Sequence, residues 1–305
     1  MVLTQNRIYI LPTRAGLLLG STLVVMLLGC INYNLGLGYV LTFLLVGIVL
    51  AALLHTFRNL ARLEFQAGRA QPVFAGDVAV FPVLIDNRSR QSRYAVCVGV
   101  ADDMLAQSLA ALDPVLVDVA SGAHALAELR LLAAQRGRMR LPRLRISSTF
   151  PLGLFRAWSY VQLDLDCIVY PRPESGEVPQ PPAREGDEEG LHSDRGTDDF
   201  AGLRKYYQGD SLRHVAWKAV ARGQPLMTKQ FDGNAAGALW LSWDDTPPFM
   251  RPEARISRLA RWVLDAGRAG LPFTLEFPGT TIASNRGPDH EARCLTALAL
   301  LKVRA

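Results

Sequence analysis

A long stretch without formal charge near the amino terminus constrains this chain more than any other feature. Between Arg14 and Arg58 the sequence contains no Asp, Glu, Lys or Arg. A membrane-spanning helix needs about 20 predominantly apolar residues, and residues 15–31 and 37–54 each approach that length, with the polar turn 32–34 between them. The sequence therefore predicts a two-helix transmembrane hairpin within residues 1–59, with residues 15–57 in contact with lipid.

Basic residues on both flanks of the hairpin set its expected orientation. Cytoplasmic loops carry an excess of Lys and Arg, and the turn between the two segments carries no charge. We therefore expect a multi-pass protein with both termini in the cytoplasm and the turn outside. The flanking arginines are Arg7, Arg14, Arg58, Arg62 and Arg69.

Two other interpretations of the apolar segments remain open. The first segment resembles a signal peptide with a basic start, and Leu27-Leu28-Gly29-Cys30 resembles a lipoprotein cleavage site. A second apolar segment follows at once and then a basic flank, which favours the hairpin. The pair could also be buried core helices, but soluble helices normally show a polar face.

The region 60–171 is expected to be all-β. Short runs of β-branched and apolar residues recur there, and several of them alternate with polar residues. Strands at this spacing, bounded by turn signals, suggest a small antiparallel sandwich. Its expected role is that of a spacer or interaction module.

Residues 172–199 differ sharply in composition from their neighbours. They contain nine acidic residues against three arginines, with closely spaced Pro and Gly. Too few apolar residues are present to form a core, so we expect a disordered or loosely held acidic linker.

The last segment, 200–305, is expected to be a short α/β region. A strand at 238–243, a helix with apolar residues at helical spacing that ends near Gly270, a strand at 273–277 and a helix at 291–303 alternate. This order implies a parallel sheet with right-handed crossovers. The chain as a whole is thus predicted to be multi-domain.

A basic, aromatic motif at residues 204–222 is the densest candidate site. Gly209 permits a tight turn, Asp210 can cap a helix, and Arg213 and Trp217 share one helical face. Such a face could bind a carboxylate, a phosphate or an acidic segment of a partner. The alternative is an internal bracket that fixes the helix to the sheet, because Trp at helical spacing is more often core. The candidate residues are Arg204, Tyr206, Gly209, Asp210, Arg213, Trp217, Lys218 and Arg222.

This motif resembles the signature of the bacterial family known as domain of unknown function 58, Tyr-x-x-Gly-Asp followed by Arg, Trp and Ala-Arg. The wider chain is similar as well: an anchor, a β-region, and Phe-Pro-Leu-Gly-Leu-Phe at 150–155 before Tyr170-Pro171. The resemblance implies a partial von Willebrand factor A-like region at the carboxyl end. It also implies a bacterial inner membrane location and a MoxR-type AAA+ ATPase as partner.

The A-like end departs from the pattern of a metal-ion adhesion site. That site needs Asp-x-Ser-x-Ser after the first strand, because Mg²⁺ prefers hard oxygen ligands in an octahedron. Asp244 fits the first position, but Thr246-Pro247-Pro248 follow Asp245 and both serines are missing. We therefore expect no metal and no other cofactor, with Asp244 the one candidate ligand.

These observations support one main hypothesis of function and two rivals. The main one is a membrane-anchored scaffold or adaptor, not an enzyme. Its cytoplasmic region would bind a MoxR-type ATPase in the assembly or maturation of a partner complex. Other membrane proteins are further candidate partners. The first rival is an anion- or nucleotide-binding enzyme or regulator that uses residues 204–222. The second is nucleic-acid binding, which the net charge of +5 does not favour.

The opposite charges of neighbouring segments suggest a regulatory hypothesis. The acidic linker at 172–199 would fold over the basic motif at 204–222 and compete with partners.

Overall fold

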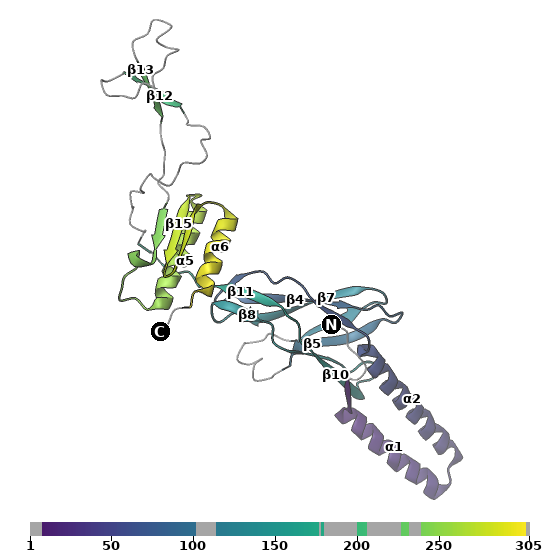
Figure 1. The fold of residues 1–305 in the computed structure, drawn as a ribbon. Coiled ribbons are helices and arrows are strands. Elements are labelled where there is room, and N and C mark those ends of the chain that lie inside the picture. The colour runs from purple at the N-terminus through teal and green to yellow at the C-terminus, as the bar shows by residue number, and fades with distance from the viewer. Residues whose placement is uncertain are drawn as a thin grey trace. The chain divides into compact units, whose positions relative to one another are not determined.

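Two compact units make up the chain, whose computed structural model describes residues 8–101, 114–176, 178–179, 200–205, 227–231 and 239–302. One unit comprises residues 1–173 with 295–305, and the other comprises residues 174–294. The structure contains two apolar helices near the amino terminus, several antiparallel sheets and a later α/β region, as predicted (Figure 1).

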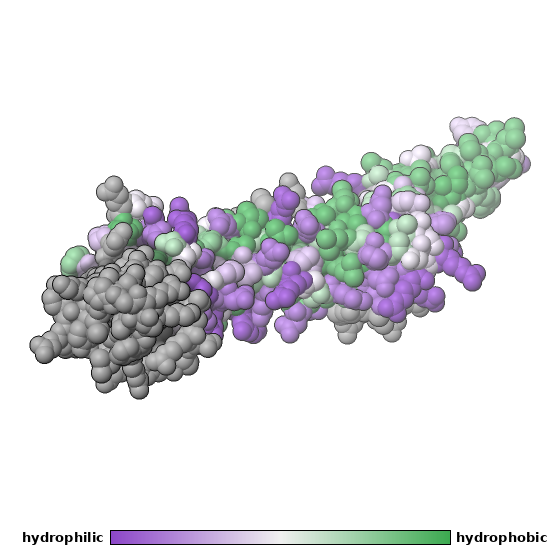
Figure 2. All heavy atoms as spheres, turned by 90° about the horizontal axis from the view of Figure 1, so that it is seen from above, coloured by the Kyte–Doolittle hydropathy of each residue, from purple (hydrophilic) through white to green (hydrophobic). Residues whose placement is uncertain are grey.

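The uncharged stretch forms helices α1 (Arg14–Tyr33) and α2 (Gly36–Leu60), each slightly longer than predicted. Thr13 caps α1 by accepting a hydrogen bond from the Gly16 amide, and Asn34 ends α1 in the left-handed conformation. Both helices are long and apolar enough to cross a membrane, judged by length and composition alone. Most of their large apolar side chains are exposed, and Figure 2 shows the pair as a largely hydrophobic surface.

Small residues let the two helices approach each other closely. A Cβ atom at Gly38 would collide with the Sγ atom of Cys30, so any larger residue there would force the Cys30 thiol to move. Cys30 and Thr42 are both buried, and the Sγ and Oγ1 atoms lie 4.0 Å apart. Close approach through small residues is typical of helix pairs in lipid.

A five-stranded antiparallel sheet contains the strand that precedes α1 and also contacts α2. Its strand order is β1-β10-β9-β5-β6. The first strand precedes α1 and pairs with a strand some 140 residues later in the sequence, Tyr9 facing Trp158. The strands are β1 (Tyr9–Pro12), β5 (Arg93–Val100), β6 (Val115–Val119), β9 (Leu144–Ser148) and β10 (Phe155–Val161).

Two three-stranded sheets complete the β-rich region. One has the order β2-β4-β7 and the other β3-β11-β8. Buried side chains of all three sheets, among them Phe65, Phe81 and Ile146, belong to one hydrophobic core. The strands are β2 (Glu64–Ala67), β3 (Val73–Phe74), β4 (Val78–Asp86), β7 (His124–Leu132), β8 (Gly137–Arg140) and β11 (Asp166–Tyr170).

Asn59 joins the end of α2 to the five-stranded sheet. Its side chain is 3% exposed, and its Nδ2 atom donates to the Tyr94 carbonyl at 2.7 Å and to the Ser148 Oγ atom at 2.8 Å. The Tyr94 amide donates back to the Asn59 Oδ1 atom at 3.0 Å. One buried amide thus satisfies both backbone groups of a strand residue and links three elements.

Two further polar contacts hold the same junction. The Arg93 guanidinium donates to the backbone carbonyls of Arg58 and Ala61 at the end of α2. Burial, together with the nearby charges of Arg58 and Arg62, lowers the pKa of Arg93. At the start of α1, the Thr13 hydroxyl donates to the Gly153 carbonyl at 2.6 Å. We call Thr13, Asn59 and Arg93 the helix–sheet joint.

The second unit contains the predicted α/β region. Strands β14 (Leu239–Ser242) and β15 (Phe273–Phe277) are parallel, as expected, and helix α5 (Pro252–Arg268) lies between them in the sequence. A short 3₁₀ turn, η4 (Trp243–Asp245), follows β14. Helix α5 buries Ile256, Leu259, Ala260 and Val263, which recur at helical spacing.

The sequence analysis missed one strand of this region. Strand β16 (Thr280–Asn285) pairs antiparallel with β15, so the sheet is not purely parallel. Helix α6 (Pro288–Leu300) begins and ends about three residues before its predicted bounds, 291–303. Strands β12 (Phe200–Lys205) and β13 (Met227–Phe231) pair with each other in a separate two-stranded sheet.

We expect the substitution Asn59→Leu to destabilise the unit that contains the helix pair. The leucine would leave the Tyr94 amide and carbonyl without the Asn59 amide, at a cost of about 1–3 kcal/mol. The thermal unfolding midpoint in detergent should fall by about 5–10 °C. Gln66→Leu, a change of the same kind at an exposed position, should leave the midpoint unchanged. Equal melting of both variants would contradict the role of Asn59.

Candidate functional site

The predicted motif lies almost entirely outside the described residues. Of the eight candidate residues, only Arg204 falls in a described element, where its backbone in β12 pairs with Thr228 in β13. At the end of this pairing Lys205 faces Met227, so the segment 206–226 starts and ends at adjacent positions of one sheet. The other candidates are outside the described residues: Tyr206, Gly209, Asp210, Arg213, Trp217, Lys218 and Arg222.

Asp244, the candidate metal ligand, lies in a turn that an arginine closes. The Arg255 guanidinium donates to the Thr246 hydroxyl and to the Trp243 carbonyl, the latter at 2.6 Å. It also lies over the Trp243 ring, 4.2 Å from the centroid. The Thr246 hydroxyl in turn donates to the Trp243 carbonyl at 2.6 Å. The Arg255 guanidinium therefore already binds the Thr246 hydroxyl and the Trp243 carbonyl of this turn.

These contacts do not fit a magnesium site at Asp244. Mg²⁺ requires several hard oxygen ligands around one point, and the one hydroxyl of the turn is engaged with Arg255. Among the described residues, no group of three or more His, Cys, Asp and Glu residues could hold a metal ion. We derive no metal chemistry from this turn.

A carboxylate sits beside this turn at the carboxyl end of the parallel strands. Glu276 faces Ser242 across β14 and β15. Its Oε2 atom accepts hydrogen bonds from the Trp240 Nε1 atom at 2.8 Å and from the Ser242 Oγ atom at 3.1 Å. Glu276 thus ties two side chains of β14 to β15 and acts as a structural acceptor.

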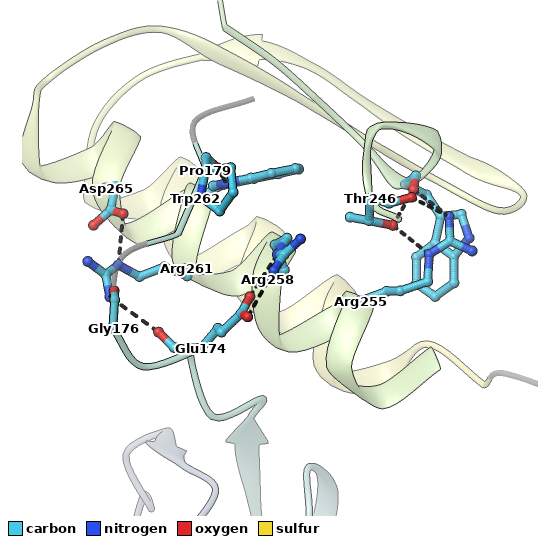
Figure 3. Close-up of polar contacts among 10 residues, drawn as sticks. Glu174, Gly176, Pro179, Thr246, Arg255, Arg258, Arg261, Trp262 and Asp265 are labelled. Carbon is cyan, nitrogen blue, oxygen red and sulfur yellow. Dashed lines mark hydrogen bonds and ion pairs between the residues drawn. The ribbon is translucent and has the colours of Figure 1, made fainter. Parts of the chain in front are cut away.

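One face of α5 binds the start of the acidic segment (Figure 3). The Arg258 guanidinium forms two parallel hydrogen bonds with the Glu174 carboxylate, Nε to Oε2 at 2.8 Å and Nη2 to Oε1 at 3.0 Å. This pairing raises the pKa of Arg258. The side chains are 13% and 29% exposed, so water screens the pair only in part. The Glu174 amide also donates to the Ser257 carbonyl at 3.1 Å.

Two neighbouring side chains of α5 extend this contact along the segment 174–179. Arg261 donates to the Glu174 carbonyl at 3.2 Å, while its Nε atom pairs with Asp265 at 2.8 Å. The Trp262 Nε1 atom donates to the Pro179 carbonyl at 2.8 Å. These contacts involve Glu174 and Pro179, two described residues of the segment 172–199 that is predicted to be a loosely held linker. The rest of that prediction lies largely outside the described residues.

A buried Cys–His pair lies on the other helix of the α/β region. The Cys294 Sγ atom is 3.7 Å from the His290 Nε2 atom, which also contacts the Phe273 carbonyl at 2.9 Å. Burial raises the pKa of Cys294 to about 11. A nucleophilic cysteine needs a lowered pKa, so this thiol has the properties of a structural residue.

The resemblance to the domain of unknown function 58 family stays a prediction after comparison with known proteins. No family model matches the chain, and no curated protein matches it.

We predict that Arg258→Gln releases the segment 174–179 from α5. The loss of a partly exposed ion pair of about 1 kcal/mol should speed hydrogen–deuterium exchange of the Glu174 amide roughly fivefold. Arg268→Gln, which removes a charge that is 70% exposed in its side chain, should leave that exchange unchanged. Unaltered exchange in the Arg258 variant would show that the pair does not hold the segment.

A second prediction concerns the stability of the protein at high pH. The folded state raises the Cys294 pKa from 9.0 to about 11, so its contribution is full below pH 9 and is lost as the pH rises towards 11. Between pH 8 and 10.5 the free energy of unfolding should fall by about 2 kcal/mol more in the wild type than in Cys294→Ala. Urea denaturation at both values measures this difference, and equal losses would refute the assignment.

Proposed function

We propose that the protein is a membrane-anchored scaffold or adaptor whose cytoplasmic region binds a protein partner. The observation that carries this proposal is the exposed apolar surface of α1 and α2. In each helix, only 11% of an apolar stretch of 18 residues is buried. An apolar surface of this size is costly in water and stable in lipid. A hairpin anchored in this way would keep the β-rich region and the α/β region on one side of the membrane.

The arginines beside the helices support an orientation with both termini in the cytoplasm. Arg14 is the first residue of α1, and Arg58 lies in the last turn of α2. The turn between the helices, residues 34–35, carries no charged residue. In a bacterial cell this arrangement corresponds to a multi-pass protein of the inner membrane.

The finer fold assignment is part of the same proposal. One core shared by three sheets supports a sandwich-like domain over residues 60–171. The parallel pair β14 and β15 with α5 between them supports a partial von Willebrand factor A-like region within residues 200–305. Both agree with the resemblance to the domain of unknown function 58 family.

The partner that this resemblance favours is a MoxR-type AAA+ ATPase, acting in the assembly or maturation of a further complex. The proposed contacts are the motif residues Arg213 and Trp217, together with Asp210 and Arg222.

The membrane part of the proposal predicts resistance to alkaline extraction. The full chain expressed in bacteria should stay in the membrane pellet after carbonate treatment, because apolar helices do not leave lipid at high pH. A phosphatase reporter fused after Ala305 should be inactive and a fluorescent reporter active, as a cytoplasmic end requires. Release by carbonate, or an active phosphatase, would contradict the anchor or its orientation.

The partner part predicts a loss of binding in a motif variant. Arg213→Ala combined with Trp217→Ala should reduce recovery of a co-expressed MoxR-type ATPase by at least tenfold, as is usual for hot-spot residues. The matched control is Arg286→Ala with Phe249→Ala, an exposed arginine and an aromatic residue that is 88% exposed. Equal recovery by all three proteins would remove the motif from the interface.

A further inference from the structure

A hollow of about 1070 Å³ lies where the five-stranded sheet meets the start of α1. Three arginines line it, namely Arg14 from α1, Arg145 from β9 and Arg156 from β10. Trp158 and Tyr160 of β10 line it as well. No Asp or Glu is among its lining residues, so the hollow combines positive charge with aromatic rings.

The alternation of the strands explains why these side chains gather on one face. Ala157 and Val161 of β10 are fully buried in the core, and Ile146 of β9 is as well. The alternate residues, Trp158 and Tyr160 of β10 and Arg145 of β9, point to the opposite face of the sheet. The register then places Tyr160 opposite Arg145 and Trp158 opposite Ser147. The cationic and aromatic residues are therefore the outward face of a sheet whose other face forms the core.

The three arginines have no acidic partner among the residues that the structure describes. The ion pairs found there involve other arginines, such as Arg88, Arg138 and Arg258. Each of these other arginines is paired with a nearby carboxylate. A cluster of three without a carboxylate favours an anion from outside the chain.

The position of the hollow identifies the source of that anion. Thr13 and Arg14, which line it, are the cap and first residue of α1. A Cβ atom at Gly16 would collide with the Leu154 carbonyl, so the first turn of α1 lies against the residue that leads into β10. If α1 enters lipid at this point, as the proposed function requires, then the hollow lies at the level of the phospholipid headgroups.

The aromatic residues have the distribution expected for that level. The rings of Tyr9 and Trp158 stack with centroids 5.8 Å apart, and the Arg143 guanidinium lies 4.4 Å from the Tyr160 centroid. Trp and Tyr are enriched at the membrane–water interface. The positive end of the α1 dipole adds to the attraction for a phosphate.

We propose that this hollow binds the phosphate headgroup of an anionic phospholipid from the leaflet in which α1 begins. Arg14, Arg145 and Arg156 bind the phosphodiester oxygens, and Trp158 contacts the glycerol and upper acyl chain. The inference rests on the proposed membrane anchor. It makes the sheet, and not the helices alone, a lipid-contacting surface.

Native mass spectrometry of the full chain, titrated with phosphatidylglycerol or phosphatidylcholine in detergent, tests this proposal. We expect one phosphatidylglycerol to be retained at least tenfold more tightly than phosphatidylcholine. Arg145→Gln with Arg156→Gln should weaken that binding roughly tenfold to thirtyfold. Arg90→Gln with Arg130→Gln removes the same charge at exposed arginines outside the hollow and should have no effect.

Three outcomes would overturn the proposal. Equal retention of both lipids would show that the hollow has no preference for anionic headgroups. Equal weakening by both double variants would assign the effect to net charge. Displacement by soluble glycerol 3-phosphate at the concentration of the lipid would identify a soluble phosphate ester as the ligand. Failure of the anchor itself is distinguishable, because carbonate would then extract the wild type.

Discussion

The buried amide of Asn59 is the contact on which the first unit depends. It lies in the last turn of α2, yet its hydrogen bonds are made with Tyr94 and Ser148, which belong to two strands of the sheet. A buried polar group must find partners, and Asn59 finds three of them on the sheet. The helices and the sheet therefore cannot separate without leaving several polar groups unsatisfied. In the proposed anchor, this joint would hold the sheet at a fixed position relative to the lipid, because no flexible linker separates the helices from the sheet.

Arginine side chains form many of the hydrogen bonds that hold the elements of both units together. The chain contains 33 Lys and Arg residues, of which only Lys205, Lys218, Lys229 and Lys302 are lysines. A guanidinium presents several donors in a rigid fork, so one side chain can bind two acceptors at once. Arg93 does so for two carbonyls at the end of α2, and Arg255 does so for the turn after β14. A lysine could not replace either contact without loss of geometry.

Features carried by local pattern were predictable, whereas features that depend on distant pairing were not. The absence of charge located α1 and α2, and strand 273–277 was predicted with its observed bounds. Strand β1 escaped notice because four residues before α1 give no periodic signal, and its partner β10 is far along the chain. Strand β16 is polar and mostly exposed, so no buried alternation marks it. For the candidate site, Arg145 and Arg156 lie on consecutive strands, but the sequence does not show that both reach one hollow with Arg14, which is more than 100 residues earlier in the chain.

Two arginine sites among the described residues, one on α5 and one around Arg145, differ in whether the chain supplies a carboxylate. On α5 the acidic segment supplies Glu174, so the charge of Arg258 is neutralised within the chain. This carboxylate is consequently not free to compete for the motif at 204–222, and any such regulation must use the later acids of the segment. Around Arg145 no carboxylate of the described residues takes that place. Arg258 is held by a carboxylate of the chain, and Arg93 and Arg255 are held by its carbonyl and hydroxyl groups. The arginines of the hollow have no carboxylate partner among the described residues, which favours an anion from the surroundings.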